Sequence, residues 1–166
     1  MEQPRKAIEM KGISKAFGTV KANEDVDLTV YSGEVHALLG ENGAGKSTLV
    51  NMLSGIYHPD SGSVRIEGKD VRLSSPKEAI ALGIGMIHQH FKLVDVLTAK
   101  ENILLGKSKG IFRRDRQLSR EIREISDRYG LDVDPDKKVY NMSVGEKQTL
   151  EIIKVLYRGA RILILD

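Results

Sequence analysis

The residues best suited to chemistry form one glycine-rich segment, Gly40-Glu41-Asn42-Gly43-Ala44-Gly45-Lys46-Ser47. This segment fits the pattern GxxxxGK[ST] at every fixed position. Glycines let the backbone fold around a polyphosphate with its N–H groups pointing inward, and a helix starting near Lys46 adds its positive N-terminal end. We therefore expect the loop and the adjoining Thr48 to bind ATP, with Lys46 at the β- and γ-phosphates and Ser47 on Mg²⁺. The alternative is a plain glycine-rich turn capped by Ser47.

A second candidate is Asp166, which directly follows the apolar run at 162–165. Such a run predicts a buried strand, and ligands of open α/β sheets lie at the carboxyl ends of strands. A carboxylate at that edge can hold Mg²⁺ through water. We expect Asp166 to act as a catalytic residue and a magnesium ligand, the alternative being an ordinary strand-end acid.

The elements around these residues alternate between strand and helix. Apolar periodicity predicts strands at 7–10, 26–30, 63–66, 71–73 and 84–87, and a nearly continuous apolar run predicts a buried strand at 35–39. Helical spacing begins at Lys46, at Pro76 and at 116–129. Two S/T-x-x-E pairs, Thr98 with Glu101 and Ser143 with Glu146, predict capping boxes at the starts of two further helices.

Composition is that of an ordinary globular domain. The 166 residues are 40% hydrophobic and 30% charged, and no apolar run approaches the length of a membrane span. The N-terminus lacks the apolar stretch of a signal peptide, and the absence of cysteine excludes disulfides, so we expect a cytosolic chain. A basic segment at 107–123 indicates either a solvated surface or a contact with an acidic partner or lipid headgroups.

The segment at 142–148, MSVGEKQ, gives the sequence a family likeness. Together with the glycine-rich loop it resembles the LSGGQ signature of ABC ATPases, read here as MSVGE, and the resemblance covers essentially the whole chain. It implies that Ser143, Gly145 and Glu146 bind the nucleotide held by an opposite subunit. A helix N-terminus with a hydroxyl and a small residue suits an anion. The alternative is a capping box that uses Ser143 internally.

Two more positions match the family by resemblance. Gln89 is similar to the glutamine that senses Mg²⁺ and the attacking water, which makes it a candidate catalytic and metal-binding residue; the alternative is a solvated loop residue. Phe17 is similar to the aromatic on which adenine stacks, the alternative being a core aromatic. His88 and His90 flank Gln89, but no third ligand is evident, so a separate metal site is not indicated.

The resemblance implies an α/β fold of the P-loop NTPase type: a mixed sheet with N-terminal antiparallel strands and a helical subdomain insertion. We expect a nucleotide-binding core at 1–90, a helical subdomain at 91–156 and a return to the core at 157–166. The family also expects a glutamate after the Walker B aspartate, here Asp166, at which the chain ends. A domain truncated after the Walker B strand should bind ATP and hydrolyse it poorly.

The likeness is strongest to ATP-binding subunits of bacterial importers for sugars and nucleosides. It implies transmembrane permease subunits, a solute-binding protein and a second ATP-binding module as partners, in a head-to-tail dimer on the inner face of the cell membrane. Segment 91–97 is the expected contact with the permease. The alternative is a soluble ABC ATPase acting on nucleic acid or ribosomes, although nucleic acid is not expected as a partner.

Overall fold

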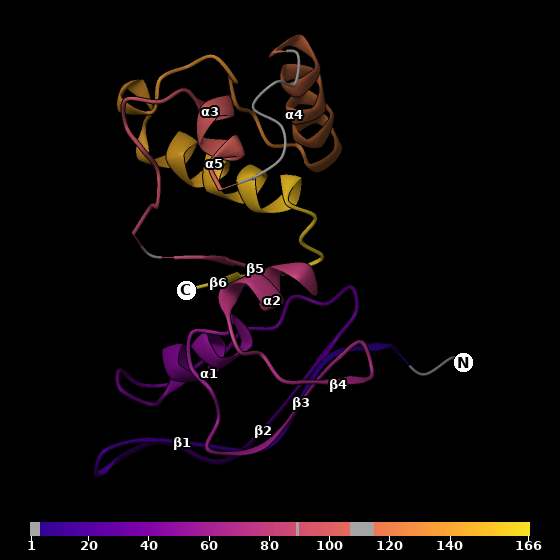
Figure 1. Ribbon diagram of the computed structural model, residues 1–166, viewed down its shortest axis with the longest axis vertical. Helices are drawn as coiled ribbons and strands as arrows, with labels where there is room; N and C mark the ends of the chain where they lie inside the picture. The colour runs from indigo at the N-terminus through magenta and orange to yellow at the C-terminus, as the bar shows by residue number, and fades with distance from the viewer. Residues whose placement is uncertain (1–3, 89, 107–114) are drawn as a thin grey trace. The chain divides into compact units, whose positions relative to one another are not determined.

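A computed structural model describes residues 4–88, 90–106 and 115–166 of the chain (Figure 1). The chain divides into two compact units, the first ending at Ile84 and the second beginning at Gly85. Each unit carries part of the predicted site.

The first unit is built on a four-stranded antiparallel sheet with the order β2-β1-β3-β4. The strands are β1 (Lys6–Phe17), β2 (Val20–Tyr31), β3 (Ser61–Ile66) and β4 (Lys69–Val71). Strands β1 and β2 form a long hairpin whose last pair is Phe17 with Val20. The predicted N-terminal antiparallel strands are therefore confirmed, and the hairpin is longer than the apolar alternation indicated.

Two helices accompany this sheet, α1 (Lys46–Leu53) and α2 (Pro76–Ala81), and Figure 1 shows both on one side of it. Helix α1 directs Leu49, Met52 and Leu53 into the interior. The sheet contributes Met10 and Ile13, which have no exposed surface. This packing fixes the first turn of α1, and hence the end of the glycine-rich loop, against the sheet.

The predicted buried strand at 35–39 is wrong. Residues 35–40 adopt no regular secondary structure, and Val35 and Leu39 are 101% and 88% exposed. A strand forms only beside a neighbour that satisfies its N–H and C=O groups. Neither sheet of the described chain includes this segment. Apolar composition alone therefore did not determine its conformation.

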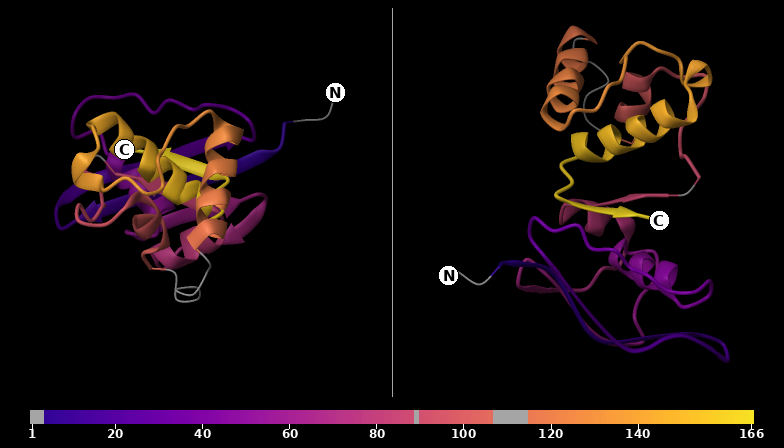
Figure 2. Two further views of the ribbon diagram at one scale, coloured as in Figure 1. Left: turned by 90° about the horizontal axis from the view of Figure 1, so that it is seen from above. Right: turned by 180° about the vertical axis from the view of Figure 1, so that it is seen from behind.

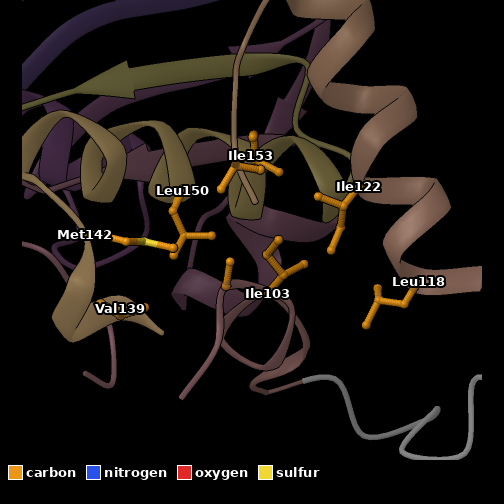
Figure 3. Close-up of a cluster of buried hydrophobic side chains, with 9 residues drawn as sticks. Ile103, Leu118, Ile122, Val139, Met142, Leu150 and Ile153 are labelled. Carbon is orange, nitrogen blue, oxygen red and sulfur yellow. The ribbon is translucent and has the colours of Figure 1, made fainter. Parts of the chain in front are cut away.

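The second unit is mainly helical, with α3 (Ala99–Leu104), α4 (Asp115–Tyr129), a short 3-10 helix (Val139–Asn141) and α5 (Val144–Tyr157). Both predicted capping boxes form, at Thr98 for α3 and at Ser143 for α5. Figure 3 shows apolar side chains from these helices meeting in one cluster. Its labelled members are all buried: Ile103, Leu118, Ile122, Val139, Met142, Leu150 and Ile153.

Strands β5 (Ile84–Ile87) and β6 (Ile162–Leu165) pair in a separate two-stranded sheet. Both lie where they were predicted, but β6 is not the buried strand expected, since Leu163 and Leu165 are 41% and 70% exposed and only Ile164 is buried. Figure 2 shows β6, in yellow, leading to the C-terminus. The N–H of Asp166 donates to the carbonyl of Ile87 at 3.1 Å, so both strands end at the same edge. No helix in the described part of the chain is long and apolar enough to cross a membrane.

Candidate nucleotide-binding site

The predicted site residues fall into two sets. The first unit carries Phe17 and residues 40–48, and the second carries Ser143, Gly145, Glu146 and Asp166. Gln89, the predicted sensor of the metal and water, lies outside the described residues.

The glycine-rich loop bends around the side chain of Lys46. The Nζ of Lys46 donates to the carbonyl oxygens of Gly40 and Glu41, each at 2.7 Å. A turn closes the loop where the N–H of Ala44 donates to the carbonyl of Glu41 at 3.2 Å. The ammonium group therefore lies against the backbone of the loop, where it is placed to meet an anion that binds there.

Glycine is required at position 45 for two separate reasons. Its φ is +83°, in the left-handed region, and a Cβ there would lie 2.1 Å from the carbonyl oxygen of Ala22 and 2.8 Å from Nδ2 of Asn23. Gly43 also has a positive φ, +85°, but a Cβ at that position would meet nothing within 4 Å. The loop is therefore pressed against β2 at Gly45 and open at Gly43.

The start of α1 suits a phosphate. Gly45 is the N-cap residue, and the helix has no side-chain cap and no acidic residue in its first turn. The positive end of the helix is therefore not offset by a carboxylate of that turn. The first three helical residues are Lys46, Ser47 and Thr48, so the predicted magnesium-binding hydroxyl lies one residue after the predicted phosphate-binding ammonium.

Phe17 lies at the tip of the β1–β2 hairpin and is 43% exposed, which excludes its alternative role as a core aromatic. Its ring packs edge-on against Tyr57, with centroids 5.1 Å apart. The carboxylate of Asp60 fixes the preceding residues, accepting from Nζ of Lys15 at 2.7 Å and from the N–H of Ala16 at 2.8 Å. These bonds lower the pKa of Asp60 and hold Phe17 at the surface of the first unit.

At the start of α5, the capping box and the predicted anion site involve the same serine. The Oγ of Ser143 accepts the N–H of Glu146 at 3.3 Å, and the Glu146 carboxylate accepts the N–H of Ser143 at 2.8 Å. The side chain of Ser143 also hydrogen-bonds to the Glu146 carboxylate, so the box engages the hydroxyl both as acceptor and as donor. The predicted capping box is therefore formed, and the contact of Ser143 with a nucleotide stays a prediction.

Glu146 is charged at neutral pH. Nζ of Lys137 donates to its carboxylate at 2.5 Å, and this bond, followed by the bonds from Ser143, lowers the pKa of Glu146 to about 2. The positive charge of Lys137 offsets the carboxylate that would otherwise repel a phosphate. Gly145 is exposed, and a Cβ there would meet nothing within 4 Å, so the fold of this unit gives no reason for a glycine.

Asp166 is exposed at the ends of β5 and β6, as predicted. The nearby imidazole of His88 has a lowered pKa, chiefly because of its burial and then because of the charge of Lys92. Asp166 and Glu151 act on His88 in the opposite direction. His88 is therefore neutral at pH 7 and adds no positive charge beside Asp166.

Sequence reasoning missed two sets of buried polar side chains that hold backbone groups in place. Asn23 on β2 is 8% exposed, and its Nδ2 donates to the carbonyl of Gly45 at 3.3 Å. In α5, Glu151 and Lys154 are both buried. Their burial could have been suspected from the sequence, because Glu151 follows Leu150 and Lys154 follows Ile153, both of them buried apolar residues of α5.

Comparison with known proteins agrees with this geometry. A family model described as "ABC transporter" matches residues 23–166. The chain is 55% identical over 161 residues to a guanosine import ATP-binding protein of Bacillus subtilis (strain 168), and 52% identical over 161 residues to a nucleoside import ATP-binding protein of Lactococcus lactis subsp. cremoris (strain MG1363). Each alignment covers 96% of this chain and 32% of the relative. The chain thus spans about a third of the length of these relatives.

Solved structures show the same fold. An ATP-binding cassette of an ABC transporter in its ADP conformation superposes with a TM-score of 0.83 at 27% identity, covering 95% of this chain and 67% of that one. A nucleotide-free cassette gives a TM-score of 0.83 at 28% identity, covering 97% and 68%. The predicted fold class is confirmed: with a family model over most of its length and the fold of a P-loop ATPase, this chain belongs to the ABC transporter family.

Proposed function

We propose that this chain is the ATP-binding part of a subunit that couples ATP binding and hydrolysis to solute import. The observation that carries the proposal is the loop at 40–47, where the Lys46 ammonium group lies against the loop carbonyls and helix α1 starts without a side-chain cap. That arrangement suits the β- and γ-phosphates of a nucleotide. Phe17 is an exposed ring on which the adenine base can stack.

Mg²⁺ is the proposed partner of the nucleotide. A serine hydroxyl and a carboxylate are the hard oxygen ligands that this ion prefers, and Ser47 and Asp166 supply them. We assign Gln89 to the same ion and to the attacking water. Mg²⁺ would neutralise charge that develops on the phosphates, while Lys46 holds their oxygens in place.

We further propose that a second module completes the site. Ser143 is exposed at the helix start and Gly145 leaves room for close approach, so the start of α5 suits the γ-phosphate of an ATP bound by an opposite module. Glu146 shapes this helix start through its capping box. The proposed core at 1–90 and 157–166 binds the nucleotide, and the proposed helical subdomain at 91–156 reaches the second module and the permease.

The proposed solute is a nucleoside or a simple sugar. Relatives at 52–55% identity are named for guanosine or nucleoside import, and a ribose import ATP-binding protein of Caldanaerobacter subterraneus is 46% identical over 162 residues. The proposed partners are permease subunits and a solute-binding protein, with the ATP-binding subunit bound at the cytoplasmic face of the membrane.

Uptake by cells tests this function. A strain lacking the full-length gene would be complemented with the wild-type gene or with Lys46→Ala, and entry of labelled guanosine, uridine and ribose would be followed. We expect wild type to restore uptake of one solute class and Lys46→Ala to restore none, at equal protein levels. Restoration by both genes, or uptake of none of the three solutes with wild type, would contradict the proposal.

A further inference from the structure

A buried ion pair on α5 forms hydrogen bonds with the backbone of Lys92, a residue that is distant in the sequence. Glu151 and Lys154 are only 5% and 7% exposed, and their charged groups lie 2.7 Å apart. The same carboxylate oxygen of Glu151 accepts the N–H of Lys92 at 3.0 Å. Nζ of Lys154 donates to the carbonyl of Lys92 at 3.1 Å. Both backbone polar groups of one residue are therefore held by one ion pair.

A second buried side chain holds the same segment two residues further on. Asn102 on α3 is 1% exposed. Its Oδ1 accepts the N–H of Val94 at 2.8 Å, and its Nδ2 donates to the carbonyls of Val94 at 3.1 Å and Thr98 at 3.0 Å. The polar backbone groups of Lys92 and Val94 are thus tied to α5 and α3, respectively.

Contacts of Asp95 also hold the segment at 92–98 against the rest of the second unit. The carboxylate of Asp95 lies 3.2 Å from Nζ of Lys147, in the first turns of α5, and the carbonyl of Asp95 accepts the N–H of Tyr140 at 3.1 Å. Two valines of the segment are exposed, Val94 at 42% and Val96 at 69%, whereas Leu93 packs against the core cluster. The segment at 92–98 is therefore fixed along its polar backbone and presents Val94 and Val96 to solvent.

Stability alone does not account for the ion pair. Desolvating two charges costs several kcal/mol per ion, and replacing a buried pair by apolar residues of similar volume is often neutral or stabilising. What an apolar pair would not supply is a donor and an acceptor for the backbone of Lys92. The ion pair thus supplies hydrogen bonds to the segment that apolar residues could not supply. This indicates that its role is to hold the segment in position on α5.

We propose that Glu151 and Lys154 are positioning residues that make segment 92–98 move together with α5. Displacement of Val94 and Val96 by a partner would then be passed to Ser143 and Gly145 at the start of the helix. Glu151 lies eight residues after Ser143, about 12 Å along a rigid helix. This inference rests on the proposed function, in which 91–97 contacts the permease and the start of α5 meets the γ-phosphate.

The test uses the full-length protein reconstituted with its permease, as wild type and as the double variant Glu151→Met/Lys154→Met. Methionine has a similar volume and leaves no charge unpaired, so the fold is expected to be retained. The matched control is Arg65→Met/Asp70→Met, which removes an exposed ion pair of 2.7 Å on β3 and β4. Lys154→Arg serves as the conservative variant because it keeps the charge and the donors.

We expect permease stimulation of ATPase activity to fall about 5-fold or more in the methionine pair, the usual range of coupling between sites. Basal ATPase activity, Mg·ATP affinity and melting temperature should stay near wild type. Hydrogen exchange at the Lys92 amide should become about 10-fold faster or more, as a bond to a charged group is lost. Lys154→Arg and the control pair should retain stimulation.

Undiminished stimulation despite faster exchange at Lys92 would overturn the proposal, as would unchanged exchange. A loss of stimulation that only parallels a fall in melting temperature would assign the pair a purely structural role and overturn it too. If wild type itself shows no stimulation, the proposed function fails first and this inference fails with it. Hydrogen exchange at the Lys92 amide separates failure of the proposed function from failure of this inference. It measures the bond between Glu151 and the Lys92 backbone without any permease.

Discussion

Substituting alanine at Gly45 or at Gly43 separates two demands that the nucleotide loop makes on glycine. Both residues have a left-handed backbone, with φ of +83° and +85°, so alanine carries the same conformational cost at each, about 1–2 kcal/mol. Only at Gly45 does the new methyl group meet other atoms. Its 2.1 Å approach to the carbonyl oxygen of Ala22 is far below 3.0 Å, a limit that real Cβ atoms essentially never cross.

The added cost at Gly45 follows from what must move. Overfilling a packed site typically costs about 1–3 kcal/mol, so Gly45→Ala should cost about 2–5 kcal/mol in total. Helix α1 resists a shift because Leu49 and Met52 are buried after the first turn. The alternative is for the loop to leave β2, which breaks the bond from Asn23 and distorts the phosphate site.

Urea denaturation and Mg·ATP titration would measure both effects. We expect Gly43→Ala to lose about 1–2 kcal/mol of unfolding free energy. Gly45→Ala should lose clearly more, or bind Mg·ATP about 10-fold more weakly than Gly43→Ala, since 1.4 kcal/mol corresponds to that factor. Equal losses of stability and of affinity in the two variants would refute the close approach of the loop to β2.

Three further predictions concern the other site residues. Phe17→Ala should weaken ATP binding by about 1–3 kcal/mol in calorimetry, because the adenine base stacks on the ring. Binding of tripolyphosphate, which has no base, should be unchanged, and equal losses for both ligands would count against stacking. Gly145→Ala should raise the unfolding free energy by up to about 1 kcal/mol, because alanine favours helices. The same variant should reduce ATP-driven pairing of modules, measured by light scattering, and unimpaired pairing would contradict the proposed contact of Gly145 with a second module. The pKa of Glu146 is lowered from 4.5 to about 2 in the folded state, so its contribution to stability is present above pH 4.5 and is lost as the pH falls toward 2. Glu146→Gln should therefore be less stable than wild type in urea at pH 7 and converge with it near pH 2, whereas a constant difference would contradict this pairing.

Much of the site was predictable because local patterns set it. The glycine spacing placed the loop between 40 and 47, and each S/T-x-x-E pair gave a capping box because both partners lie within one helical turn. The amphipathic stretch at 116–129 became α4, whose Leu118 and Ile122 enter the core. These features depend on neighbours in sequence.

What the sequence left undetermined depends on neighbours in space. The apolar run at 35–39 predicted a strand, but a strand needs a hydrogen-bonding partner that composition does not specify. The contact of Gly45 with Ala22 joins residues that are distant along the chain. Glu151 and Lys154 were not singled out from the sequence, because such residues are rarely buried unless paired. Their burial became visible only with the backbone of Lys92 beside them.

Calorimetric titration of Mg·ATP into folded wild type and into Lys46→Ala tests directly whether the loop at 40–47 binds ATP through Lys46. The two bonds from Nζ of Lys46 to the loop carbonyls place its ammonium group where the phosphates would lie. We expect wild type to bind Mg·ATP at one site and Lys46→Ala to bind it at least about 10-fold more weakly, since charge-assisted bonds contribute about 1.5–3 kcal/mol. Equal affinity in the two proteins, or no binding by wild type, would contradict nucleotide binding by this loop.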